Sequence, residues 1–308
     1  MHDIFLVICY YSSRLMLVLS KLPRLFVPMT IKKKKKKTKT NKEDSCLSDS
    51  ADRHDLYERS VQCAESEVDF VDQQYLALRK RKAIKLREDF CGTAQVSFEW
   101  IKRRRENIAI GVDNDSKVIA WGISRHMSQL KSSRKNRVTL RKGNVLDVKT
   151  DPQDVVLATN FSYWCFKERN KLLHYFENVL DNLVEDGIFF LDCYGGYDAY
   201  RPLKESTEHD DFTYIWEQAD FNPVNSHTLC HIHFEFPDGS KLERAFSYSW
   251  RIWTLPEIRE ILLQAGFSQS LVFWQGWDEE EKEGSGEFDI VEKADPDAGW
   301  IAYVAAMK

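Results

Sequence analysis

The stretch Leu86–Ala94, "LREDFCGTA", sets two acidic residues before a short loop with one glycine. A short apolar run ends at its first residue, and "AQVSFEWIKRRRE" after it has helical spacing. A loop between a strand and a helix can approach a nucleotide-like ligand closely, and a glycine favours that approach. We therefore predict cofactor contacts from the residues of this loop: Glu88, Asp89, Phe90, Cys91, Gly92 and Thr93.

Polar residues also follow the next two predicted strands. Asp113 and Asn114 end "IAIGVDN", 21 positions after Gly92, where an acidic residue can accept hydrogen bonds from ribose hydroxyls. Asn144 and Asp147 of "GNVLD" follow the strand "RVTLRKG" and are placed to meet an adenine amino group, and Val145 between them is also a predicted cofactor contact. Because parallel strands end at one edge of their sheet, these side chains are expected to converge.

Each of these residues also has a plain structural interpretation. Asp113 could cap the helix that begins near Asp115, and Asn144 could be a turn residue. The agreement in order and spacing favours a binding edge over two independent coincidences.

The loop does not suit a dinucleotide. A pyrophosphate on a helix N-terminus needs two or three glycines, whereas Phe90 and Ala94 occupy two of the usual glycine places. Glu88 and Asp89 would also repel an anion. S-adenosylmethionine carries an ammonium and a cationic sulfonium but no phosphate, so the same departures favour it as the cofactor.

The chain resembles the class I S-adenosylmethionine-dependent methyltransferases over about residues 52–308. "LREDFCGTA" is similar to their first motif, "LDLGCGTG", and this resemblance implies Glu88 at the acidic position and Phe90 at the first glycine. Together with "SFEWI" and "GVDND…WG", it resembles an uncharacterised bacterial and fungal branch. "WTLPEIREILLQAGF" and "WIAYVAAM" resemble the family's last helix and its strand hairpin. The resemblance also implies a seventh strand that runs antiparallel between the fifth and the sixth.

The pattern of the chain agrees with such a fold. Residues 83–196 alternate strands and helices, which predicts a doubly wound, mostly parallel α/β sheet, Rossmann-like and seven-stranded. A long helix is expected from 168 to a C-cap at Gly187. Period-two alternation then predicts an antiparallel β insert at about 205–253, and an acidic loop is expected over 278–290. We predict one methyltransferase domain, 51–308, behind a tail, 1–50.

The loop after the fourth strand, "NFSYWCFKERN", is where an acceptor should meet the sulfonium. Asn160 is a predicted cofactor contact, Ser162 and Trp164 are predicted substrate contacts, and Tyr163 is a candidate catalytic residue. Packing of an aromatic-rich loop is the competing interpretation. The N-P-P-[YF] motif of enzymes resembling the adenine methyltransferases is missing here, which disfavours that class.

The insert adds further candidates. His231 and His233 share one strand face and are candidate general bases. They could ligate a metal, but no third ligand is evident, so no metal is predicted. Arg251 and Trp253 are candidate substrate contacts, although an arginine beside core tryptophans explains them equally well.

Charge and cysteine content limit the partners. Residues 1–50 carry a balance of +7, so residues 51–308 carry −11, which makes nucleic acid an unfavoured partner. Seven scattered cysteines without a C-x-x-C pair indicate reduced thiols and a cytoplasmic protein. The tail holds the lysine run Lys32–Lys37 and no clean membrane span, and is expected to be disordered, with a mitochondrial or nuclear address as the alternative.

The expected function is methyl transfer from S-adenosylmethionine to a small-molecule or metabolite acceptor. An RNA or protein methyltransferase, and an inactive S-adenosylmethionine-binding module, are the alternatives. The acceptor's identity and the oligomeric state leave no pattern in the sequence.

Overall fold

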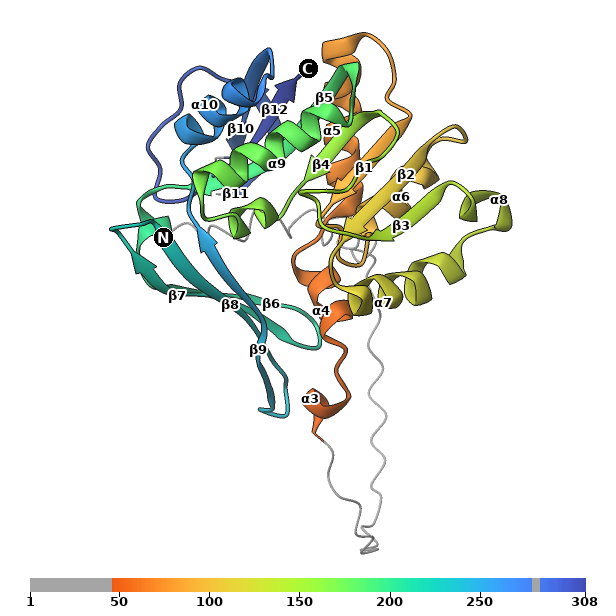
Figure 1. Cartoon of the computed structure of the whole chain (residues 1–308). Helices are drawn as coiled ribbons and strands as arrows, with labels where there is room; N and C mark the ends of the chain where they lie inside the picture. The colour runs from red at the N-terminus through yellow and green to blue at the C-terminus, as the bar shows by residue number, and fades with distance from the viewer. Residues whose placement is uncertain (1–45, 279–282) are drawn as a thin grey trace, which may run out of the picture.

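The computed structural model describes residues 46–278 and 283–308 (Figure 1). Most of the predicted tail lies outside these residues. The described chain begins with the helices α3 (Leu47–Ser50), α4 (Arg53–Ser60) and α5 (Ala64–Arg79). Within the described residues no helix is both long enough and apolar enough to cross a membrane.

Eight strands form the main sheet in the described residues, in the order β11-β10-β12-β5-β4-β1-β2-β3. In chain order they are β1 (Lys85–Asp89), β2 (Ile108–Asp113), β3 (Val138–Lys142), β4 (Gln153–Ala158), β5 (Leu183–Gly195), β10 (Gln269–Asp278), β11 (Glu283–Ile290) and β12 (Trp300–Met307). Strands β1 to β5 are parallel, and β12 lies antiparallel between β5 and β10. The predicted α/β fold and the antiparallel position of the last strand are confirmed, but the predicted number of seven strands is wrong, because β11 pairs with β10 as an eighth strand.

Both faces of the main sheet are buried under helices. Successive residues along a strand point to opposite sides, so they contribute alternately to two cores. In β4, Val155 and Leu157 belong to the core under α5 and α6, whereas Val156 and Ala158 belong to the core under α9 and α10. The helices that follow β1 are α6 (Gln95–Arg103), α7 (Ser116–His126), α8 (Ser132–Lys135), α9 (Arg169–Asp181) and α10 (Leu255–Ala265). Three short 3₁₀ turns accompany them: η1 (Met127–Gln129), η2 (Ser162–Cys165) and η3 (Tyr197–Tyr200).

Two expectations about boundaries are wrong. Helix α9 ends at Asp181 rather than at Gly187, because the Asn182 side chain accepts bonds from the backbone N–H and the hydroxyl of Thr150 and turns the chain into β5. The expected acidic loop at 278–290 contains the strand β11, which pairs with β10. Its Phe288 packs against Phe70, which explains why this polar segment is extended.

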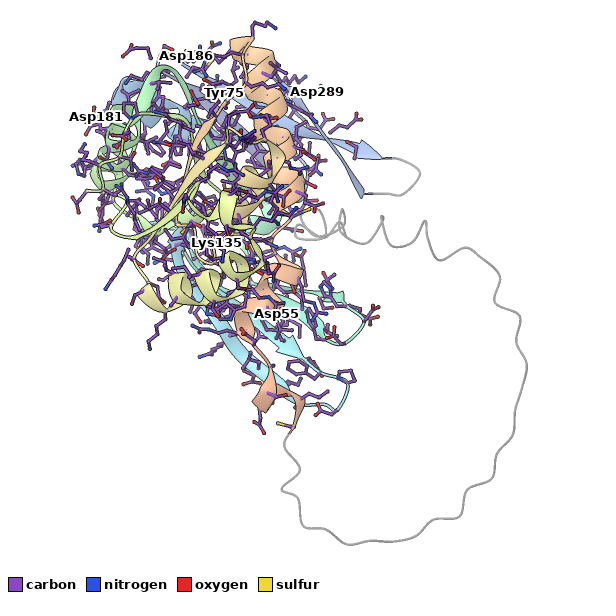
Figure 2. The ribbon with its side chains drawn as sticks, turned by 90° about the vertical axis from the view of Figure 1, so that its right-hand side faces the viewer. Asp55, Tyr75, Lys135, Asp181, Asp186 and Asp289 are labelled. Atoms are coloured by element: carbon purple, nitrogen blue, oxygen red, sulfur yellow. The ribbon has the colours of Figure 1, made fainter. Side chains whose placement is uncertain are left out.

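The insert sheet consists of β6 (Leu203–Glu208), β7 (Thr213–Asn222), β8 (His227–Glu235) and β9 (Lys241–Arg251), all antiparallel. It lies beyond the carboxyl ends of the parallel strands (Figure 1). In Figure 2, Asp55 of α4 lies near this sheet, while Tyr75 and Asp186 lie at the opposite end of the molecule. The insert sheet therefore faces the edge at which the sequence predicts a ligand.

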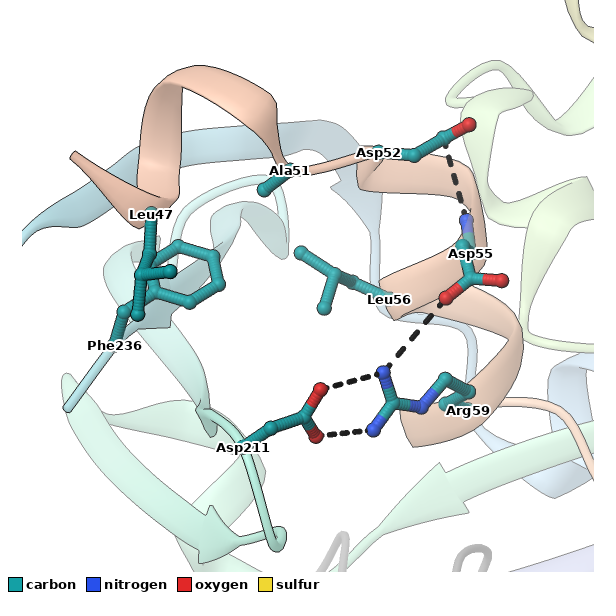
Figure 3. Close-up of a pocket in the computed structure, with 8 residues that line it drawn as sticks. All are labelled: Leu47, Ala51, Asp52, Asp55, Leu56, Arg59, Asp211 and Phe236. Carbon is teal, nitrogen blue, oxygen red and sulfur yellow. Dashed lines mark hydrogen bonds and ion pairs between the residues drawn. The ribbon is translucent and has the colours of Figure 1, made fainter. Parts of the chain in front are cut away.

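Helix α4 joins the insert sheet to the rest of the molecule. The Arg59 guanidinium makes two contacts with the Asp211 carboxylate in the β6–β7 turn and lies over the ring of Phe212 (Figure 3). Arg59 also contacts Asp55 of its own helix, at 3.7 Å. The insert sheet is thus held by charge as well as by apolar packing.

Close packing between α7 and the loop after β1 can be tested at Gly122. A Cβ at this position would lie 2.2 Å from the carbonyl oxygen of Thr93, so Gly122→Ala must displace the loop or the helix. We expect the free energy of unfolding in urea to fall by about 1–3 kcal/mol. Gly143→Ala is the control, since its Cβ would meet only ordinary contacts at 3.8 Å. Equal stability of the two variants would contradict this packing.

Candidate functional site

The loop after β1 keeps the backbone of a glycine-rich turn with a single glycine. Phe90, Gly92 and Ala94 all have left-handed backbone, with φ of 56°, 53° and 63°. Left-handed backbone costs a residue with a side chain about 1–2 kcal/mol. The Phe90 ring offsets part of this cost by packing against Phe166 and Tyr175, at centroid distances of 5.8 and 5.6 Å.

The two acidic residues before the loop point to opposite faces of β1. The Glu88 carboxylate lies on the α6 side, where one oxygen accepts the Ser97 N–H at 2.8 Å and the Ser97 hydroxyl at 2.5 Å. Asp89 lies on the α9 side and binds Arg87 at 2.7 and 3.1 Å. The Tyr175 hydroxyl donates to Asp89 at 3.0 Å. Since Asp89 is bound by a buried arginine and a tyrosine, Glu88 is the better placed of the two to act on a cation.

Asp113 ties the end of β2 to the loop after β1. One carboxylate oxygen accepts the Gly92 N–H at 2.9 Å and the other accepts the Asp115 N–H at 2.8 Å. The N-cap of α7 is Asp115, whose carboxylate accepts the Lys117 N–H. The structure therefore puts Asp113 at the predicted edge rather than in the capping role, with the exposed Asn114 beside it.

Asn144 forms the turn that the competing interpretation describes. Its side-chain oxygen accepts the Leu146 N–H at 3.1 Å, and its amide donates to Asp147 at 3.1 Å. Val145 is buried, and its carbonyl accepts a bond from Asn178. Contacts of this segment with an adenine ring remain a prediction.

The turn after β4 has the same strained backbone as the turn after β1. Asn160 and Phe161 have φ of 58° and 54°, and their N–H groups donate to the Asp192 carboxylate of β5 at 2.6 and 2.9 Å. The hydroxyl of the preceding Thr159 donates to Glu67 of α5 at 2.9 Å. Two buried carboxylates from separate elements therefore fix the turn that carries Asn160.

Three buried carboxylates next to this edge have only neutral hydrogen-bond partners in the described residues. Burial raises the pKa of Glu67 to about 7 and the pKa of Glu88 and Asp192 to about 8, against the opposing hydrogen bonds. Repulsion from Glu67 adds to the rise at both other groups. A cationic ligand would relieve this repulsion.

The aromatic candidates after β4 are core residues. Tyr163 is fully buried, and its hydroxyl donates to the backbone carbonyl of Asp192 at 2.7 Å. Trp164 is also fully buried and packs against Tyr194 at 4.6 Å. Only Ser162 of the three predicted positions is partly exposed. The packing interpretation thus describes Tyr163 and Trp164.

The candidates on the insert are engaged away from the predicted edge. Cys230 and Ile232 of β8 belong to the same core as Phe161, so the intervening His231 and the neighbouring His233 face the other side of the insert sheet. His231 bonds Ser247 at 2.8 Å, and His233 bonds Glu217 at 2.8 Å.

The remaining pair supports the connection between β9 and α10. Arg251 lies 3.6 Å from the centre of the Trp253 ring and donates to Glu257 and to the carbonyl of Lys167. Trp253 is fully buried, and its indole N–H donates to the carbonyl of Phe166 at 3.1 Å. These contacts hold both side chains against the backbone of Phe166 and Lys167, in the loop after β4, as supports of that loop.

Sequence reasoning missed Glu67, Thr159 and Asp192. Glu67 reads as one acidic residue in an amphipathic helix, and Asp192 as the only charge in the apolar strand "IFFLDCYGG". Asp192 could have been recognised from the sequence, because a charge inside a buried strand needs a specific partner.

Two pockets adjoin helix α4. One, of about 250 Å³, lies between α3, α4 and the insert sheet, with Leu47 and Phe236 in its wall (Figure 3). The other, of about 660 Å³, extends from the α4–α5 junction to α6 and α7 and includes Gln95, the first residue of α6. Neither is lined by the three buried carboxylates, which places both beside the edge rather than on it.

The turns are compatible with an S-adenosylmethionine-like group. A Cβ on Gly92 would meet no atom within 4 Å, so open space adjoins the loop backbone. In the described part of the chain the Thr93 hydroxyl is buried and has no hydrogen-bond partner. Among residues 46–278 and 283–308, no cluster of three or more His, Cys, Asp or Glu side chains has the arrangement of a metal site.

Comparison with solved structures identifies the fold. An S-adenosylmethionine-dependent methyltransferase from Clostridium acetobutylicum matches with a TM-score of 0.60 and 15% identity, over 82% of this chain and 96% of its own. CalS10, an amino pentose methyltransferase from Micromonospora echinaspora, matches with 0.58 and 13%, over 83% and 96%. The sugar N-methyltransferase KedS8 from Streptoalloteichus matches with 0.56 and 12%, over 93% and 99%.

No protein-family profile matches the chain, and no curated protein does. The chain therefore has the fold of S-adenosylmethionine-dependent methyltransferases, established by structure at low sequence identity.

The buried carboxylates predict an unusual pH dependence of stability. Burial raises the pKa of Glu67, Glu88 and Asp192 above the ordinary range of carboxyl groups, so these groups bind more protons in the folded chain than in the unfolded chain between about pH 4 and 8. These three groups then contribute a loss of stability as pH rises through this window. Urea unfolding at pH 6, 7, 8 and 9 measures this. Rising stability over that range would contradict the assignment, and Glu67→Gln should reduce the slope.

The ion pair of Asp89 predicts a structural role for that residue. Asp89→Asn leaves Arg87, which has no exposed surface, without its counter-charge. We expect the free energy of unfolding to fall by about 3–5 kcal/mol. Asp186→Asn is the control, because its ion pair with Arg81 is partly exposed and should contribute about 1 kcal/mol or less. Similar losses in the two variants would argue against this role.

Proposed function

We propose that this chain is an S-adenosylmethionine-dependent methyltransferase that acts on a small molecule. The observation that carries the proposal is the convergence, at one edge of a methyltransferase-type sheet, of two strained turns and three buried carboxylates with neutral partners. Such an edge favours a ligand that brings positive charge and hydrogen-bond donors but no phosphate.

Several residues would hold the cofactor. The backbone from Phe90 to Thr93 approaches the ligand, and Asp113, which already orients the Gly92 N–H, is placed to accept from ribose hydroxyls. Glu88 supplies negative charge for the ammonium from the α6 side. Asn114, Asn144 and Val145 are the adenine-side contacts in this proposal.

When bound, S-adenosylmethionine supplies an electrophilic methyl group. The protein's own task is to align the acceptor with that group and to exclude water. The turn at Asn160 is suited to this task because Asp192 and Glu67 fix its backbone. Ser162 is partly exposed on the same turn, and its hydroxyl, which donates to the Thr159 carbonyl, can accept a hydrogen bond from the methyl acceptor.

A small acceptor suits the architecture better than a macromolecule. The insert sheet lies beyond the carboxyl ends of the parallel strands (Figure 1), and we infer that it limits the size of an acceptor that reaches this edge. Two solved structures with this fold are described as an amino pentose methyltransferase and a sugar N-methyltransferase, which supports the same class of acceptor here. The acidic balance of residues 51–308 also opposes nucleic acid.

Binding measurements on the full chain test the proposal. Isothermal titration should detect S-adenosylmethionine and S-adenosylhomocysteine, and NAD⁺ should show no heat of binding because the loop lacks the glycines that a pyrophosphate needs. Binding of NAD⁺ alone, or of none of the three, would overturn the proposal.

Asp113 provides a residue-level test. Asp113→Ala removes the carboxylate that orients Gly92 and faces the ribose, and should weaken S-adenosylhomocysteine binding by about tenfold or more, as expected for a charged hydrogen bond. Asp115→Ala is the control, since it removes a neighbouring carboxylate that caps α7 and should change affinity by less than about threefold. Equal affinities of both variants would exclude Asp113 from the cofactor site.

A further inference from the structure

Glu67 accepts fewer hydrogen bonds than Glu88 and Asp192, the other two buried carboxylates of this edge. Asp192 accepts two backbone N–H groups, and Glu88 accepts two groups of Ser97. Glu67 accepts one hydroxyl, that of Thr159, and its side chain has no ion-pair partner among the described residues. It is the group at this edge with the most hydrogen-bonding capacity left.

Glu67 lies beside the turn at which we expect the methyl group to be transferred. Its partner Thr159 directly precedes Asn160, in the turn where the acceptor should meet the methyl group. Glu67 also lies in the first turn of α5, where the helix dipole favours the carboxylate form. The unpartnered Thr93 hydroxyl and the open space at Gly92 are independent signs that a ligand belongs beside these turns.

We propose that Glu67 binds the amine nitrogen of the acceptor and takes its proton, which makes the acceptor a small amine. This inference rests on the proposed methyl transfer. The alternative bases are engaged elsewhere: Tyr163 donates to a backbone carbonyl in the core, and His231 and His233 face the other side of the insert sheet.

The chemistry balances with no further reactant. An ammonium acceptor gives one proton to the Glu67 carboxylate and becomes a neutral amine. The nitrogen lone pair forms the new N–C bond to the methyl group, while the C–S bond breaks and its electron pair stays on sulfur. The products are the N-methylated acceptor in its ammonium form, S-adenosylhomocysteine and protonated Glu67. Glu67 returns its proton to water after the products are released.

The surroundings of Glu67 suit a proton acceptor near neutral pH. Burial raises its pKa to about 7, close to the value at which a base is both ionised and basic. The titratable groups that interact with it are Glu88 of β1, Asp192 of β5 and Tyr303 of β12, and none of these is a cation. The protein side chains of this cluster therefore bring no positive charge that would repel an incoming ammonium.

Sinefungin is a direct probe, because it carries a primary amine where S-adenosylmethionine carries its methylated sulfonium. Its affinity relative to S-adenosylhomocysteine, measured by isothermal titration on the full chain, reports attraction at the transfer position. We expect wild type to prefer sinefungin by about tenfold, with the preference growing from pH 6 to pH 8 as Glu67 ionises. Glu67→Gln should lose both the preference and its pH dependence, with S-adenosylhomocysteine affinity nearly unchanged.

Glu65→Gln is the matched control, since it removes an exposed carboxylate from the same turn of α5 and should behave as wild type. A Glu67→Gln variant that keeps the sinefungin preference would overturn the role of Glu67 while leaving the proposed function intact. Failure of wild type to bind either ligand would instead overturn the proposed function. If Glu67→Gln does not fold, Thr159→Val decides: removal of the donor should shift the pH profile of the preference upward, and an unshifted profile counts against the proposal.

Discussion

Removal of carboxylates from water is the constraint on which this structure depends. Glu67, Glu88 and Asp192 are each less than a tenth exposed, and their partners in the described residues are hydroxyl and amide groups. An uncompensated buried charge is costly, so the folded protein would be more stable without these three carboxylates. The backbone around them is strained as well, with left-handed residues after both β1 and β4. Strain and desolvation concentrated at one edge are typical of a binding site and not of a core.

The period-two geometry of β1 separates two roles within one dipeptide. Leu86 and Glu88 face α6, whereas Arg87 and Asp89 face α9, where Tyr175 completes a closed set of hydrogen bonds. An Arg–Asp pair with no exposed surface anchors the strand just before the loop. The neighbouring carboxylate, one residue earlier, keeps a neutral partner and so remains responsive to a ligand's charge. The side chains of adjacent residues on a strand point to opposite faces of the sheet. One acidic side chain can therefore stabilise the strand while the next is available to bind a ligand.

Local patterns in the sequence predicted the elements whose determinants are local. The capping box of Thr254 and Glu257, the C-cap at Gly266 and the turn at "PDGS" each depend on contacts within a few residues, so the local sequence is enough to predict them. The end of α9 was missed because Asn182 is held by Thr150, 32 positions away. The candidate site divides in the same way. Asp113 was predicted from its spacing to Gly92, whereas the pairing of Glu67 with Thr159 spans 92 positions and has no local signature.

Phe90 and Ala94 therefore change how the loop after β1 is held. Phe90 and Ala94 adopt the backbone that glycine would adopt freely, at about 1–2 kcal/mol each. Packing of Phe90 on Phe166 and Tyr175, the bond from Gly92 to Asp113 and the contact of Gly122 with Thr93 together supply the compensation. A loop fixed by side-chain packing has less freedom to adapt than one built from glycine, so it is matched to one ligand shape. In the proposed function, the side chains of Phe90 and Ala94 that fix this loop are also the ones that disfavour a pyrophosphate, which gives specificity and stability a common origin.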